Sequence, residues 1–141
     1  MRKFVSVISF AAGLCVIAGS AEANPTCALD GTWLVTTQRG SATFTTKLVA
    51  ATHAYTVDRT GGGLPDAHIV GSYTYEAASN KIVVTNTSAS TQDMAFYACV
   101  NVPGTYTVAF SDCTHFTFQL VTDACQARTL NAGRAVFTKQ P

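Results

Sequence analysis

The chain has 141 residues, a length that suits a single domain with one core, and its formal net charge is only +1. A chain so close to neutral lacks the basic surface that binding to nucleic acid or to an anionic membrane requires. After the first 23 residues no segment is long and apolar enough to cross a bilayer, so we expect no membrane span.

The first residues have the three parts of a signal peptide. Arg2 and Lys3 form a positive start, residues 4–18 form an uncharged apolar stretch, and Ala21-Glu22-Ala23 matches the A-x-A cleavage pattern. The apolar stretch is shorter than the ~20 residues that span a bilayer, which argues against a membrane anchor. We therefore predict cleavage before Asn24 and export, either to the periplasm or to the exterior.

Removal of the signal peptide, residues 1–23, would leave residues 24–141 as one domain in which basic and acidic side chains are equal in number. Its cysteines are Cys27, Cys99, Cys113 and Cys125. An even number of cysteines in an exported domain predicts two disulfides. A zinc site is not expected, because no two of these cysteines form a C-x-x-C pair.

Short runs of Thr, Val, Tyr and Phe alternate with polar residues in the rest of the chain, and this pattern predicts strands. Turn residues recur every eight to twelve positions. The predicted strands are 31–38, 42–50, 53–59, 68–75, 81–87, 94–101, 104–110, 115–122 and 133–139. The second and third could also be one bent strand, and a helical turn is expected around 125–130. Strands of this kind indicate an all-β sandwich or barrel, and closure favours the barrel because it leaves no exposed edge. We therefore predict an antiparallel up-and-down barrel of about eight strands.

The alternation also predicts which faces point inward, because a ring buries more apolar area than a threonine does. Inward faces are expected to carry Tyr73 and Tyr75, then Tyr106, Val108 and Phe110, then Phe116, Phe118 and Leu120. These rings could fill the core or could line a pocket for a small molecule. The candidate lining residues are Tyr55, Tyr73, Tyr75, Phe96, Tyr106, Phe116 and Phe118, with His53 and His115 as further polar groups.

The segment Cys27–Trp33 reads CALDGTW, and Gly31-x-Trp33 at the head of the first strand resembles the G-x-W signature of lipocalins and the wider calycin superfamily. The resemblance implies that the tryptophan closes the barrel floor and that an arginine lies across its ring. Arg128 and Arg134 are the candidates for that arginine. The same segment is similar to the start of avidins, but their biotin sites need several tryptophans and this chain has one.

The barrel interpretation predicts a disulfide pairing. With the first strand starting at the floor, Cys27 and Cys113 lie at the floor, and Cys99 and Cys125 lie at the top. A strand of eight residues spans roughly 26 Å, whereas the Cα atoms of a disulfide lie within ~7 Å. We therefore expect the pairs Cys27–Cys113 and Cys99–Cys125.

Groups that could carry catalysis or hold a cofactor are sparse. The three histidines, at positions 53, 68 and 115, share no spacing, so neither a metal nor another cofactor is predicted. The glycine-rich segment 61–66 lacks the ending of a phosphate loop and predicts a hairpin loop or a lid. Asp58-Arg59 could orient a ligand or form a solvated pair at a strand end. No G-x-S-x-G motif is present, and paired cysteines leave no thiol nucleophile.

Three functional hypotheses follow. The first is an exported lipocalin-like barrel that binds a small apolar or aromatic molecule in its lumen. The second is a protein-binding module, such as an inhibitor of an extracellular hydrolase, that acts through its loops. The third is a barrel enzyme, a cyclase or isomerase, which the lack of an evident catalytic group disfavours.

Overall fold

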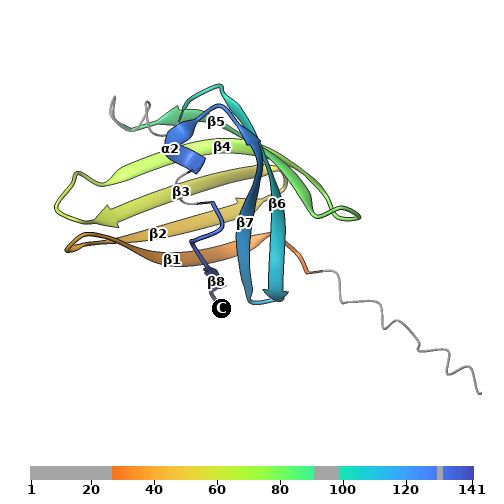
Figure 1. Ribbon diagram of the computed structural model, residues 1–141, viewed down its shortest axis with the longest axis horizontal. Coiled ribbons are helices and arrows are strands. Elements are labelled where there is room, and N and C mark those ends of the chain that lie inside the picture. The colour runs from red at the N-terminus through yellow and green to blue at the C-terminus, as the bar shows by residue number, and fades with distance from the viewer. Residues whose placement is uncertain (1–26, 91–98, 130–131) are drawn as a thin grey trace, which may run out of the picture.

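A computed structural model describes residues 27–90, 99–129 and 132–141 and shows a closed antiparallel barrel (Figure 1). Each strand pairs with the next, and the last pairs with the first. The strands are β1 (Gly31–Arg39), β2 (Ala42–Ala51), β3 (Ala54–Gly61), β4 (Ala67–Glu76), β5 (Lys81–Ala89), β6 (Pro103–Asp112), β7 (His115–Asp123) and β8 (Phe137–Lys139), with the helical turn α2 (Gln126–Thr129) between the last two. The predicted all-β barrel is confirmed. The predicted signal peptide lies outside the described residues.

Three details differ from the predicted strands. Residues 99–101 form a turn rather than the end of a strand, and the rest of the expected strand 94–101 lies outside the described residues. The last strand begins at Phe137, not at Gly133. β2 and β3 are separate strands, joined at Thr52 and His53, which adopt φ values of 49° and 67°. Non-glycine residues seldom adopt positive φ, so the sequence gives no clear sign of this turn.

Alternation explains most of the core. In β2, Phe44 and Leu48 are buried and Thr45 is exposed between them. Tyr106, Val108 and Phe116 are buried as predicted, but Leu120 is 48% exposed. The prediction for Leu120 is wrong because a β-bulge interrupts the pairing of β6 with β7 there, and β8 pairs with β7 only at its other end. The upper half of β7 is therefore open on one side.

Trp33 closes the barrel floor. Its side chain is fully buried, and its Nε1 donates a hydrogen bond to the Leu29 carbonyl oxygen at 2.8 Å. The Phe116 ring packs edge-on against the indole, with 4.6 Å between the ring centroids. The cation over the indole is the Lys139 ammonium, 5.2 Å from the ring centroid. Lys139 is the direct partner of Trp33 in the β1–β8 register, so its side chain emerges on the same face.

The predicted arginine at this position is therefore wrong. Arg128 lies at the opposite end of the barrel, beside Asp123, and Arg134 is exposed. Arg128 lies in α2, which follows β7 at the end of the barrel away from the Trp33 floor. The order of the strands in the barrel, rather than the closeness of an arginine to the last strand, decides which cation reaches the indole.

Both predicted disulfides are present. Cys27–Cys113, with a Cα–Cα distance of 4.9 Å, ties the segment before β1 to the β6–β7 turn at the floor. Cys99–Cys125, with a Cα–Cα distance of 5.8 Å, ties the segment before β6 to the segment after β7 at the top. Two disulfides indicate that the protein folds in an oxidising environment.

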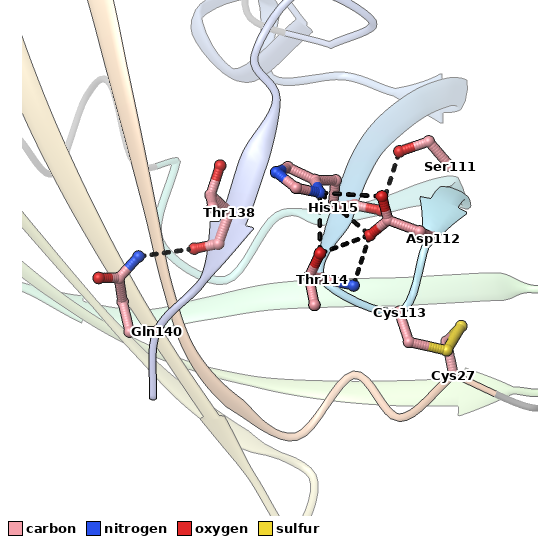
Figure 2. A network of polar contacts seen from close by, with 8 residues as sticks. All are labelled: Cys27, Ser111, Asp112, Cys113, Thr114, His115, Thr138 and Gln140. Atoms are coloured by element: carbon pink, nitrogen blue, oxygen red, sulfur yellow. Dashed lines mark hydrogen bonds and ion pairs between the residues drawn. A yellow bond between two sulfur atoms is a disulfide. The ribbon is translucent and has the colours of Figure 1, made fainter.

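The turn that carries Cys113 is held by hydrogen bonds to one carboxylate (Figure 2). Asp112 accepts from the Thr114 hydroxyl at 2.6 Å, from the His115 ring at 3.0 Å and from the Thr114 backbone N–H at 2.7 Å. These bonds hold the pKa of Asp112 at about 2. The floor disulfide is therefore attached to an ordered turn.

Removal of the floor disulfide is expected to destabilise the fold more than removal of the top one. Cys27–Cys113 joins residues 86 apart in sequence and Cys99–Cys125 joins residues 26 apart. In the chain-entropy model these constraints are worth about 4.6 and about 3.6 kcal/mol. Urea unfolding of the Cys27→Ala/Cys113→Ala and Cys99→Ala/Cys125→Ala variants measures the difference. The reverse order would show that packing of the buried Cys125 outweighs chain entropy.

Candidate ligand-binding site

The barrel encloses a cavity of about 430 Å³. This volume falls within the ~300–1,000 Å³ that is usual for sites that bind small molecules. Its wall is mostly apolar and extends from Leu29 near the floor to Phe44 and Leu64 near the top, where Ala127 and Arg128 of α2 also border it. The few polar side chains along it are Thr37, Thr46, Arg59, Asn86 and Arg128, besides the tyrosine hydroxyls.

The structure brings four of the predicted lining residues together along this cavity: Tyr55, Tyr73, Tyr106 and Phe118. Phe96 lies outside the described residues. The other four lie elsewhere. Phe116 is buried in the floor cluster against Trp33, and Tyr75 donates its hydroxyl to Asn80 at an exposed turn.

The structure also places the two predicted histidines away from the cavity. His53 is exposed in the β2–β3 turn, and His115 pairs with Asp112 in the β6–β7 turn. Period-2 alternation assigns a side chain to a face of the sheet, but it does not say how far along the barrel axis the residue lies. Both histidines lie at strand ends, which the alternation cannot distinguish from the lumen.

A buried hydrogen bond crosses one wall of the cavity. The Tyr55 hydroxyl donates to Oδ1 of Asn86, the buried polar residue of β5. The two residues are separated by β4, and the ring passes over Gly71, where any Cβ would overlap it. Burial raises the pKa of Tyr55 to about 12, so its hydroxyl stays neutral. Gly71 thus allows a tyrosine on β3 to reach an amide on β5.

A second polar group lies at the top of the cavity. Asp123, whose side chain is shielded from solvent, binds Arg128 through two hydrogen bonds of 2.7 and 2.8 Å and also accepts one from the Tyr106 hydroxyl. Burial acts to raise the pKa of Asp123, but the bonds from Arg128, Tyr106 and the Cys125 backbone N–H outweigh it and lower that pKa. Arg128 also donates to the Val102 carbonyl oxygen at 2.8 Å, so α2 is fixed to the chain before β6.

Arg59 differs from Arg128 in its surroundings. It lines the cavity, its guanidinium lies 5.4 Å from the centroid of the Phe44 ring, and one Nη donates to the Pro65 carbonyl oxygen at 3.2 Å. Its Nε is buried and has no hydrogen-bond partner among the described residues. A buried N–H without a partner costs about 1–3 kcal/mol, so this is an unfavourable arrangement for the protein alone.

The side chains of the neighbouring residues Asp58 and Arg59 lie on opposite faces of the sheet. Asp58 points outward and binds His68 Nδ1 at 2.6 Å, whereas Arg59 belongs to the cavity wall. The prediction of a solvated pair is therefore wrong for Arg59, and the alternative that the residue orients a ligand stays a prediction. Alternation with Tyr55 and Val57, which also line the cavity, is the sequence signal that places Arg59 there.

Comparison of the chain with protein-family models, with curated proteins and with solved structures found no match. Within residues 27–90, 99–129 and 132–141, no cluster of His, Cys, Asp or Glu has the composition of a metal site. In the same part of the chain no helix is long and apolar enough to cross a membrane.

The Tyr55–Asn86 bond is expected to contribute to stability. Tyr55→Phe removes the donor of a buried acceptor and should lower the free energy of unfolding by about 1–2 kcal/mol. Tyr75→Phe is the matched control, because its bond to Asn80 is exposed, and it should cost less than about 0.5 kcal/mol. Chemical denaturation of both variants measures the effect, and equal losses would contradict it.

The Asp123–Arg128 pair predicts a pH dependence. Since the pKa of Asp123 is lower in the folded chain than its ordinary value of 3.8, the pair stabilises the fold above that value, and the contribution is lost as the pH falls through the folded pKa. Asp123→Asn should therefore be less stable than the original protein at neutral pH, and the gap should shrink below about pH 4. Thermal unfolding at a series of pH values tests this, and a constant gap would contradict it.

Proposed function

We propose that the protein is an exported, lipocalin-like barrel of the periplasm or the exterior that binds a small apolar or aromatic molecule in its lumen. The observation that carries the proposal is the cavity of about 430 Å³, whose wall is largely aliphatic and aromatic. Removal of an apolar ligand from water contributes about 25 cal/mol for each Å² that is buried, which gives such a wall its affinity.

The placement of the polar groups supports the same proposal. The Tyr55–Asn86 and Asp123–Arg128 contacts pair several of the polar groups that border the lumen with one another. Away from Arg59, the wall therefore exposes mainly apolar surface to a guest. The G-x-W resemblance at Gly31 and Trp33 is consistent with this use, and here the indole closes the floor under Lys139.

The two disulfides favour a preformed site. Cys27–Cys113 fixes the floor and Cys99–Cys125 fixes the segments near α2, which borders the cavity. A site that exists before the ligand arrives does not spend binding energy on ordering loops. We therefore expect ligand binding to leave the barrel backbone nearly unchanged.

Filling the cavity tests the proposal. N-phenyl-1-naphthylamine, a neutral aromatic fluorophore, should bind the original protein with enhanced fluorescence. Thr46 lines the cavity, so Thr46→Phe should occupy part of its volume and weaken probe binding at least about tenfold. Thr45→Phe on the same strand is the matched control, because Thr45 is exposed on the outer face, and it should leave the affinity unchanged.

Native mass spectrometry of protein taken from its own source would complement the titration by revealing a molecule that remains bound. Failure of the fluorophore to bind, or equal affinities in Thr46→Phe and Thr45→Phe, would contradict binding in the lumen. Circular dichroism and thermal unfolding confirm that both variants retain the barrel.

A further inference from the structure

Arg59 carries a charge that the described part of the protein does not neutralise. Two arginines border the cavity, and Arg128 is paired with Asp123 through two short hydrogen bonds. Arg59 forms no ion pair with any described carboxylate, since its neighbour Asp58 binds His68 on the outer face. The tyrosines that border the lumen do not compensate it, because burial raises the pKa of Tyr55 and Tyr73 to about 12 and leaves both neutral.

The guanidinium is also held in place. It lies over the Phe44 ring and donates one N–H to the Pro65 carbonyl oxygen in the β3–β4 loop. The Phe44 ring is itself fixed against Gly62, which has a φ of +67° and lacks the Cβ that would overlap the ring. Leu64 from the same loop lines the cavity and is 53% exposed, so this part of the wall forms the rim of the mouth. An ordered cation at an apolar rim is suited to hold the charged end of a guest.

We propose that the ligand has an apolar body and a carboxylate, and that the carboxylate binds the Arg59 guanidinium at the mouth of the cavity. This inference rests on the proposed function. The charge of Arg59, which no described carboxylate neutralises, selects an anion over a neutral acceptor, and its buried Nε–H, which has no partner among the described residues, leaves the guanidinium short of acceptors. A planar carboxylate matches the donor geometry of a guanidinium, and hydrogen bonds between ionised partners are about twice as strong as neutral ones.

The orientation of the ligand follows from the same geometry. Arg59 lies near the top end of β3, beside Thr46 of β2 and Ala67 of β4 in the register, whereas Leu29 and Tyr73 border the cavity nearer the floor. The apolar body therefore extends down the lumen from the rim. The residues that it meets are aliphatic and aromatic, with Tyr55 engaged by Asn86.

A matched pair of ligands tests the inference. Decanoate and 1-decanol share an apolar chain and differ in the charged end, and each is titrated against bound N-phenyl-1-naphthylamine. The original protein should bind decanoate at least about tenfold more tightly than 1-decanol, as expected for a hydrogen bond to a charged group. Arg59→Gln should bring the two affinities within about threefold, once each is corrected for the affinity of that variant for the fluorophore.

Lys47→Gln is the matched control, since Lys47 is an exposed cation on the neighbouring strand β2. This substitution also removes one positive charge, but from the outer surface of the barrel. It should keep the tenfold preference. Arg59→Lys retains the charge without Nε and should keep only part of the preference.

The outcomes separate the two proposals. Equal affinities for decanoate and 1-decanol in the original protein would overturn the carboxylate site while leaving lumen binding intact, and this result needs no variant. A preference that survives in Arg59→Gln would also overturn it. If neither the fluorophore nor either decyl compound binds, the proposed function itself fails.

Discussion

The contact between β1 and β8 closes the barrel, and the lumen depends on it. β8 has three residues, and it pairs with β1 at Trp33 and Leu34 and with β7 at His115 and Phe116. So short a ladder is supported by the side chains beneath it: Phe137 stacks on Phe116 at 4.9 Å, and Lys139 lies over the Trp33 indole. Hydrophobic and cation–π contacts at the floor thus stabilise a closure that few backbone hydrogen bonds could hold alone.

A narrow closure also explains why the disulfides lie where they do. Cys27–Cys113 joins the segments before β1 and β7 at the same floor, and Cys99–Cys125 restrains the chain that leads from β7 to α2. Both crosslinks limit movement of β7, whose upper half lacks β8 as a neighbour (Figure 1). The exposed Leu120 and Val121 mark that open stretch. The two crosslinks therefore lie at opposite ends of β7, the strand that β8 covers only in part.

Polar side chains within the barrel fall into two kinds. Tyr55, Asn86, Tyr106, Asp123 and Arg128 satisfy one another, as buried polar groups generally must. Arg59 keeps a buried N–H with no described partner and a charge with no described counter-ion. A departure from the general rule is informative about function, because a protein bears such a cost where a ligand can relieve it.

Much of the fold could be predicted from the sequence. Period-2 alternation depends on local backbone geometry alone, so it identified most strands and the inward faces that carry Tyr106 and Phe116. Strand order then fixed which cysteines share an end of the barrel, and the disulfide pairing followed. The sequence by itself thus determined the all-β architecture and, through the strand order, the pairing of the crosslinks.

The tertiary structure alone decided the contacts between elements that are distant in sequence. It placed Lys139, not Arg128, over Trp33, and it put His53 in an exposed turn and His115 at the first residue of β7, beside Asp112. It also put Tyr55 across Gly71 onto Asn86 and left Arg59 in the cavity wall while Asp58 turned outward. The physical reason is that alternation gives the face of a sheet, whereas height along the barrel and partners across its lumen depend on register, bulges and closure.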